Sequence, residues 1–356
     1  MEQTPLFQLN LMLWLVWPAL PASASIRPIF REDGFTLRGI GWAFALPLEV
    51  RARAEKADLP LKVRASPDLL LDHRQRKLLL PIECKVNSFG PNASGESRTH
   101  PALQAAALLA ADGPSVADYL GLTEAAQWQA YLLYAVGGGA EEAMQGTLTE
   151  LGHRLQAAHI EPVPAGALGI HLRDDGIYLQ PAPGARIPVT ALQAPPPNGV
   201  RVMEWEEDDD PRPLYLLPWD PSIGPADDYE RRVLEERVRS ALASLIGRRL
   251  DEPAFEVTLD EVLQEAVEVW EMWRDRQAVA GFQRAVRRYV RQVLNRLSKM
   301  GLNVQIRQDT LVFDLVTPDI ARKVRSYLSS AAFRRGELDL WSEDAQLGFD
   351  SLAEGW

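Results

Sequence analysis

Cysteine is almost absent from this chain: Cys84 is the only one among 356 residues. A single cysteine excludes an internal disulfide framework and fits a reducing compartment, so we expect a cytoplasmic protein. Long apolar runs are also absent, because the stretch 11–17 is too short to span a bilayer. No lysine or arginine precedes Arg27, whereas a secretory signal starts with a positive segment. We therefore expect a buried helix or strand, with Trp14 and Trp17 packing inside the first domain or on a partner, and no membrane contact.

Positive charge is in short supply as well. The chain has 38 basic and 49 acidic residues, which gives a net charge of −11. Residues 181–230 hold 3 basic and 10 acidic residues, whereas residues 231–356 hold 20 of each. This balance argues against a strong stand-alone nucleic-acid binder, although phosphate contacts depend on local patches rather than on net charge. A partner protein that supplies basic surface is therefore expected.

Two common kinds of site are missing from the sequence. His73, His100 and His153 have no cysteine or second histidine at a metal-ligand spacing. Gly137–Gly139 lacks the spacing and the lysine of a phosphate-binding loop, so it predicts an ordinary loop. Among the histidines, His100 is the best placed to approach a phosphate, because it lies between a predicted strand and the helix after it.

The most informative feature is a predicted β-hairpin. Two apolar runs, 61–73 and 77–86, flank a short polar break. If the turn centres between residues 75 and 76, Asp68 lies opposite Glu83, with Cβ atoms roughly 4.5–5.5 Å apart. Side chains two residues apart share one face of a strand, so Lys85 joins Glu83 and the intervening cysteine points away.

This arrangement has a chemical meaning. Two facing carboxylates repel each other unless a positive charge lies between them. Mg²⁺, or Mn²⁺ in its place, prefers a few carboxylate oxygens together with waters and phosphate oxygens. A bound metal lowers the pKa of a water and offsets charge on a phosphate. The lysine could orient that water or contact the phosphate, so the residue types fit phosphodiester hydrolysis.

The order Pro67-Asp68, spacer, Glu83-x-Lys85 resembles the PD-(D/E)xK nuclease superfamily, which includes restriction enzymes, recombination nucleases and phage-defence nucleases. The resemblance implies an α/β, restriction-endonuclease-like fold in which a mixed sheet is flanked by helices. It also implies Asp68 and Glu83 as metal ligands, with the backbone carbonyl of Cys84, and Lys85 as the catalytic lysine.

Members of the superfamily often carry a polar residue on the next helix, and Gln104 occupies that position in the predicted helix 101–108. The tyrosine that follows this glutamine in one branch is absent here. Glu32 and Glu49 are both candidates for a further acid. The resemblance thus implies an Mg²⁺-dependent DNA endonuclease or nickase. The acidic net charge, the tryptophan-rich start and the second helical domain predict a subunit of a bacterial antiviral-defence or DNA-processing complex with an ATPase, helicase or sensor partner. The alternatives are a non-catalytic scaffold that keeps the fold, and a ribonuclease.

Composition divides the chain into three parts: a nuclease-like domain in 1–180, a proline-rich acidic linker in 181–227, and a mainly helical domain in 228–356. The acidic run 204–210 is either a solvated connector or a DNA-mimicking segment that covers a basic groove. In the last part, Thr258 and Glu261 predict a capping box.

A strongly amphipathic helix follows that capping box. Its apolar side carries Val286, Tyr289, Val293 and Leu297. The two strand-like runs after it form a predicted hairpin, so we expect a winged-helix-like module that binds DNA or a protein partner. The basic side, which could contact DNA phosphates, the preceding acidic helix or a partner, carries Arg284, Arg287, Arg288, Arg291 and Lys299.

Overall fold

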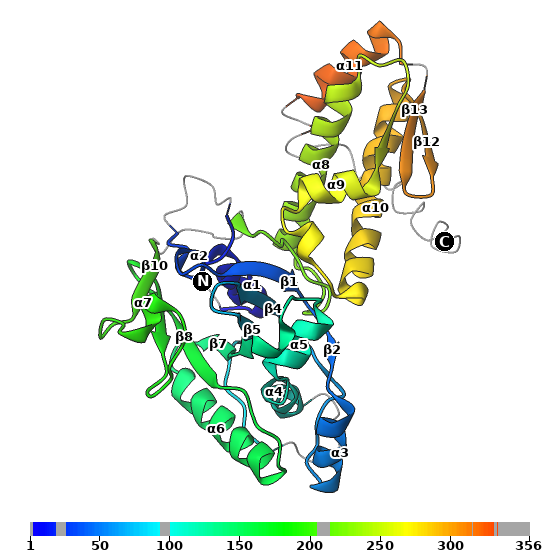
Figure 1. The fold of residues 1–356 in the computed structure, drawn as a ribbon. Helices are drawn as coiled ribbons and strands as arrows, with labels where there is room; N and C mark the ends of the chain where they lie inside the picture. Colours follow the sequence, from blue (N-terminus) through cyan, green and yellow to red (C-terminus); the bar gives the residue numbers. More distant parts are fainter. Residues whose placement is uncertain are drawn as a thin grey trace. The chain divides into compact units, whose positions relative to one another are not determined.

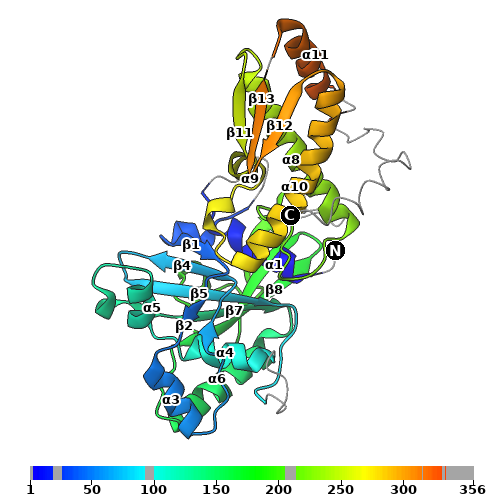
Figure 2. The same cartoon turned by 90° about the vertical axis from the view of Figure 1, so that its right-hand side faces the viewer.

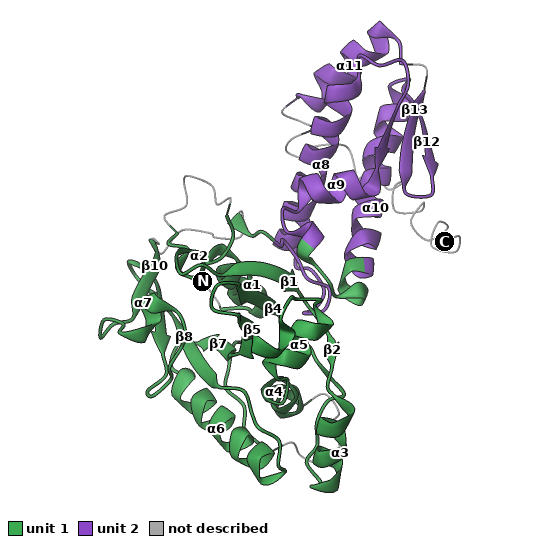
Figure 3. Ribbon diagram, viewed as in Figure 1, with its two compact units in different colours: residues 1–216, 272–279 green, residues 217–271, 280–356 purple. Residues whose placement is uncertain are grey.

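A computed structural model (Figure 1) describes residues 3–18, 26–92, 100–204, 214–314, 316–330 and 333. The chain forms two compact units (Figure 3). Unit 1 comprises Met1–Leu216 and Met272–Val279, and unit 2 comprises Leu217–Glu271 and Ala280–Trp356. In the described part of the chain, no helix is both long enough and apolar enough to cross a membrane.

Unit 1 is an α/β structure built on one large, curled mixed sheet. In chain order its elements are α1 (Pro5–Trp14), α2 (Ile29–Glu32), β1 (Thr36–Ile40), β2 (Phe44–Ala45), α3 (Leu48–Lys56), β3 (Arg64–Ala65), β4 (Leu69–His73), β5 (Leu78–Lys85), α4 (Pro101–Leu109), α5 (Gly113–Tyr119), the 3-10 helix η1 (Ala125–Gln127), β6 (Gln129–Ala130), β7 (Leu132–Gly137), α6 (Glu141–Ala157), β8 (Ala165–Arg173), β9 (Gly176–Pro181), α7 (Thr190–Gln193) and β10 (Val200–Glu204).

The strand order in the large sheet is β1-β4-β5-β7-β8-β9-β10, with β6 paired to β5. The centre is parallel, since β7 runs parallel to both β5 and β8. Both flanks are antiparallel hairpins, β4–β5 on one side and β8–β9 on the other. The predicted mixed sheet is therefore confirmed. A separate two-stranded sheet pairs β2 with β3.

Helices cover both faces of this sheet (Figure 2). Strand alternation sends Leu132 and Tyr134 into one core cluster, where they pack with Leu108 of α4 and Leu148 of α6. Helix α1 packs against β5. The predicted N-terminal buried element is thus the helix α1. The expectation that Trp14 might pack on a partner is wrong, because its side chain is fully buried and its Nε1 donates to the carbonyl of Leu214.

The predicted boundaries of the linker differ from those in the structure. Residues 181–204 are part of unit 1, because β10 pairs with β9 and buries Val200 and Val202. Residues 272–279 also return to unit 1. A strand this short, set between a proline cluster and an acidic run, gives little periodic signal, which explains the error. Apart from Glu204, the acidic run lies outside the described residues.

Unit 2 combines helices with a small antiparallel sheet of strand order β11-β13-β12. Its apolar residues include the stacked pair Phe255 and Phe313, with ring centroids 4.5 Å apart. The predicted hairpin is present as β12 and β13. The elements are α8 (Asp228–Arg249), β11 (Phe255–Thr258), α9 (Leu259–Ala266), η3 (Trp270–Met272), α10 (Arg276–Lys299), which begins in unit 1, β12 (Asn303–Arg307), β13 (Thr310–Asp314) and α11 (Pro318–Leu328).

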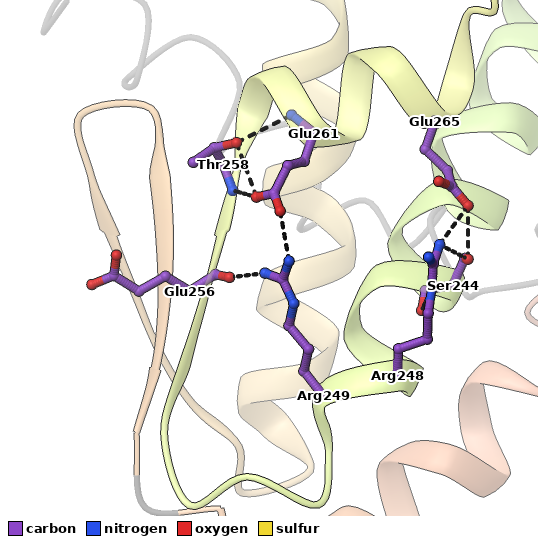
Figure 4. A network of polar contacts seen from close by, with 7 residues as sticks. All are labelled: Ser244, Arg248, Arg249, Glu256, Thr258, Glu261 and Glu265. Carbon is purple, nitrogen blue, oxygen red and sulfur yellow. Dashed lines mark hydrogen bonds and ion pairs between the residues drawn. The ribbon is translucent and has the colours of Figure 1, made fainter.

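A polar network joins the end of α8 to the start of α9 (Figure 4). The predicted capping box is present: the Glu261 amide donates to Thr258 Oγ1 at 3.1 Å, and the Thr258 amide donates to Glu261 Oε2 at 2.6 Å. Arg249 Nη2 donates to the other oxygen of Glu261 at 2.6 Å. Arg248 bonds Glu265 in the same way at 2.7 Å. An N-cap bond of this kind contributes about 1 kcal/mol, so the network fixes the α8–α9 connection.

Candidate functional site

The observed register brings the two predicted carboxylates together. Strand β4 pairs with β5 so that Leu69 faces Ile82 and Leu71 faces Leu80. Continuing this register by one residue places Asp68, just before β4, opposite Glu83. This is the register that a turn centred between residues 75 and 76 predicts. The short turn fixes it, because the position of the turn in a hairpin decides which residues face each other.

Asp68 is held in place by the neighbouring backbone. Its Oδ2 accepts a hydrogen bond of 2.6 Å from the amide of Cys84, and its carbonyl accepts one of 2.9 Å from the amide of Gly41. The amide and carbonyl of one strand residue face the same neighbouring strand, so the Cys84 carbonyl also lies on the Asp68 side. The Cys84 side chain is buried, and burial raises the pKa of its thiol well above the usual range. Cys84 therefore contributes its backbone here and not a nucleophilic sulfur.

Glu83 and Lys85 share one face of β5, as predicted. Lys85 Nζ lies 2.8 Å from Glu83 Oε1, and the lysine side chain keeps 34% of its surface exposed. Glu83 is only 4% exposed, and its Oε2 has no hydrogen-bond partner among the described residues. The site thus combines a partly exposed ammonium group with a buried carboxylate oxygen that has no partner among the described residues.

The electrostatics of the site reflect two carboxylates in a confined space. Burial and the nearby charge of Asp68 raise the pKa of Glu83 to about 7, against the opposing effect of Lys85. Burial also raises the pKa of Asp68, although Lys85 and the Cys84 amide offset part of this. Burial alone would lower the pKa of Lys85, but the two carboxylates outweigh it and the pKa rises. Lys85 is therefore a cation at neutral pH, while Glu83 is close to its titration point.

The residues present fit a hard divalent cation. Asp68 and Glu83 supply carboxylate oxygens, and the partnerless Oε2 of Glu83 is an unused ligand atom. No cluster of three or more His, Cys, Asp or Glu side chains forms within the described residues, so neither Glu32 nor Glu49 completes such a set. Two carboxylates are enough for Mg²⁺, because this ion commonly takes one or two carboxylates and fills its other coordination positions with waters and phosphate oxygens.

Gln104 lies in α4, as predicted, but bonds to the loop before the site and not to the carboxylates. Its Nε2 donates to the carbonyl of Ser66 at 2.6 Å, and its side chain is buried. It therefore fixes the Ser66–Asp68 segment and is a positioning residue. His100 is the N-cap of α4, where its Nδ1 accepts from the amide of Ala102 at 3.2 Å. Its expected approach to a phosphate has no further support in the structure.

Two neighbours of the site were not predicted. Tyr134 of β7 pairs with Glu83 in the parallel register and lies on the same sheet face. Its buried hydroxyl has no partner among the described residues, and burial, with the charges of Glu83 and Asp68, raises its pKa well above the usual range. Lys62 lies close enough for its charge to lower the pKa of Glu83. Neither was accessible from sequence, because both depend on contacts between segments distant along the chain.

The predicted basic face of α10 is only partly exposed. Arg284, Arg288 and Lys299 are exposed, while Arg291 is half-buried. Arg287 forms an ion pair of 2.7 Å with Asp309 at the turn between β12 and β13. The opposite side is apolar as predicted, with Val286, Val293 and Leu297 buried and Tyr289 half-buried. The helix thus has an interior face and a basic face, and the sequence did not indicate the ion pair of Arg287.

Comparison of the chain with protein-family models, with curated proteins and with solved structures gave no match.

Proposed function

We propose that the protein is a metal-dependent nuclease that hydrolyses phosphodiester bonds in DNA, with Mg²⁺ (or Mn²⁺) bound by Asp68 and Glu83. The observation that carries this proposal is the placement of these two carboxylates opposite each other on adjacent strands, with Lys85 ion-paired beside them. A bound cation would supply Lewis-acid chemistry, lowering the pKa of a water and offsetting negative charge on the phosphate.

The remaining roles belong to the protein's own side chains. Lys85 places a partly exposed positive charge beside Glu83, where it contacts the scissile phosphate or orients the attacking water. Gln104 keeps Asp68 in position through Ser66. Asp68 and Glu83 must both be ionised to bind a cation, so we expect activity to rise as the pH passes through the pKa of about 7 of Glu83.

The architecture supports the same proposal. A mixed sheet flanked by helices, with the carboxylates at the adjacent strands β4 and β5, is what a restriction-endonuclease-like core leads us to expect. In unit 2 the order helix, strand, helix, helix, strand, strand, and the sheet order β11-β13-β12, are those expected of a winged-helix-like module. In such a module α10 would be the DNA-reading helix, and Arg284, Arg288 and Lys299 would contact phosphates.

A second candidate is a non-catalytic scaffold that keeps the nuclease fold. The observation that favours it is the small ligand set: among described residues, no third acidic or histidine side chain joins the two carboxylates. The ion pair of Lys85 with Glu83 would then be purely structural.

A cleavage assay separates these candidates. Purified full-length protein is incubated with supercoiled plasmid, and separately with RNA, in Mg²⁺ or in EDTA. We expect nicked or linear plasmid in Mg²⁺ and none in EDTA, with faster cleavage at pH 8 than at pH 6 because Glu83 must ionise. No cleavage of either substrate, alone or with the products of neighbouring genes, would support the scaffold. Cleavage of RNA but not of plasmid would show that the protein is a ribonuclease and not a deoxyribonuclease.

A further inference from the structure

An aromatic cluster with one exposed ring lies next to the candidate site. Tyr119, at the end of α5, is 55% exposed although its ring is fixed. Its hydroxyl donates to the carbonyl of Ala43 at 3.2 Å. Its ring centroid lies 6.0 Å from that of Trp42, at an interplanar angle of 82°, and 6.4 Å from that of Phe44. The ring therefore presents surface to solvent without the freedom of a loose side chain.

The cluster is connected directly to Asp68. Trp42 follows Gly41, whose amide donates to the Asp68 carbonyl. The indole lies against Gly39, where a Cβ would come within 2.2 Å of the Trp42 Nε1, so only glycine fits there. Gly39 pairs with Leu70, which belongs to the same core cluster as Tyr134. Trp42 is therefore on the sheet face that carries the carboxylates.

Basic side chains lie near the Trp42 ring and near Glu83, in a chain that is acidic overall. The guanidinium of Arg274 lies 5.8 Å from the Trp42 ring centroid. The Arg274 backbone is held in place because its amide donates a hydrogen bond of 2.8 Å to the Ile40 carbonyl. Arg64 is exposed on β3, and Lys62, two residues earlier, acts electrostatically on Glu83. The nearby Asp275 carboxylate accepts from the amides at the start of α10.

Exposed apolar side chains extend the same surface. In the described part of the chain, the exposed large apolar side chains of unit 1 are Leu48, Val63 and Tyr119. Leu48 and Val63 flank the β2–β3 pair, where the Leu46 amide donates to the Val63 carbonyl. Exposed apolar side chains mark a binding site where they form one large contiguous patch.

We propose that Tyr119 and Trp42 form a base-stacking surface for an unpaired stretch of the nucleic acid, beside the phosphate at Asp68 and Glu83. The inference rests on the proposed nuclease function and narrows its substrate to nucleic acid with a single-stranded part. Bases stack on exposed aromatic rings whatever their sequence, and neighbouring cations contact the strand's phosphates. The positive charges of Arg274 beside Trp42 and of Lys62 near Glu83 favour this occupant over an apolar protein segment.

The test measures binding, not cleavage. Full-length protein without divalent metal is titrated into a labelled single strand of about 20 nucleotides containing 2-aminopurine, and into the matching duplex. Wild type is compared with Tyr119→Phe, which keeps the ring, Tyr119→Leu, which keeps apolar bulk, and Ile223→Ala, an exposed apolar residue of unit 2.

We expect Tyr119→Phe and Ile223→Ala to bind as wild type does, and Tyr119→Leu to bind the single strand between about 5-fold and about 100-fold more weakly, with less quenching of 2-aminopurine. Duplex affinity should stay the same. Wild-type affinity in Tyr119→Leu, or an equal loss on duplex, would overturn the stacking surface and leave a protein-docking surface. If Tyr119→Leu weakens single-strand binding while wild type cleaves nothing in Mg²⁺, the stacking surface stands and the proposed cleavage fails.

Discussion

Replacing Lys85 with methionine should reduce the rate of Mg²⁺-dependent DNA cleavage by roughly 10²–10³-fold, the usual cost of removing one preorganised charge from a transition state. Lys85 carries the ammonium group that lies 2.8 Å from Glu83 Oε1, and its side chain is 34% exposed. Methionine keeps an unbranched side chain of similar length but removes the charge. Initial rates of plasmid nicking at saturating Mg²⁺ measure the effect.

The matched control is Lys77→Met. Lys77 lies at the other end of β5, where it pairs with Glu124 on the surface. The Lys77→Met variant loses the same charge from the same hairpin and should cleave DNA at the wild-type rate. If both variants lose activity equally, the loss reflects net charge. If Lys85→Met keeps activity within a few-fold of wild type, Lys85 has no catalytic role.

The metal-free protein should lose stability as the pH rises, because of Glu83. The folded state raises the pKa of this carboxyl from 4.5 to about 7. Between these values the folded protein binds more protons than the unfolded chain, so the free energy of unfolding falls with increasing pH and levels off above about 7. A shift of this size corresponds to about 3 kcal/mol. Glu83→Gln removes the titrating group and should be the more stable protein at alkaline pH.

Urea unfolding in EDTA at about pH 5 and about pH 8 measures this difference. The control is Glu142→Gln, which changes an exposed carboxylate on α6 and should keep the wild-type pH dependence. The same pH dependence in Glu83→Gln and in wild type would show that Glu83 is not held in this environment. Adding Mg²⁺ at pH 8 should raise the stability of wild type but not of Glu83→Gln, because only a folded site with both carboxylates binds the ion.

The local part of the site could be predicted from sequence. The strands of the β4–β5 hairpin are joined by a short turn, so the turn position fixes which residues face each other. Asp68, Glu83 and Lys85 therefore follow from the sequence alone. Gln104 was placed on the correct helix, but its bond to Ser66 depends on how α4 packs against the loop before β4, which no local pattern contains.

The other neighbours of the site, and the strand β10, depend on pairing between segments that are distant along the chain. Tyr134 comes beside Glu83 only because β7 crosses over to run parallel to β5, and such crossovers are not encoded in either strand. Trp42 lies near Asp68 because the Gly41 amide donates to the Asp68 carbonyl, and Arg274 lies near Trp42 because residues 272–279 belong to unit 1. The strand β10 could not be predicted, because the prolines and acidic residues around it are typical of a linker.

The central claim is that Asp68 and Glu83 bind one divalent cation. Mn²⁺ titrated into the full-length protein at pH 8, with free Mn²⁺ followed by electron paramagnetic resonance, tests it most directly. We expect one saturable site in wild type and in Lys85→Met, and its loss in both Asp68→Asn and Glu83→Gln. Mn²⁺ binding that is absent in wild type, or unchanged in Glu83→Gln, would contradict it.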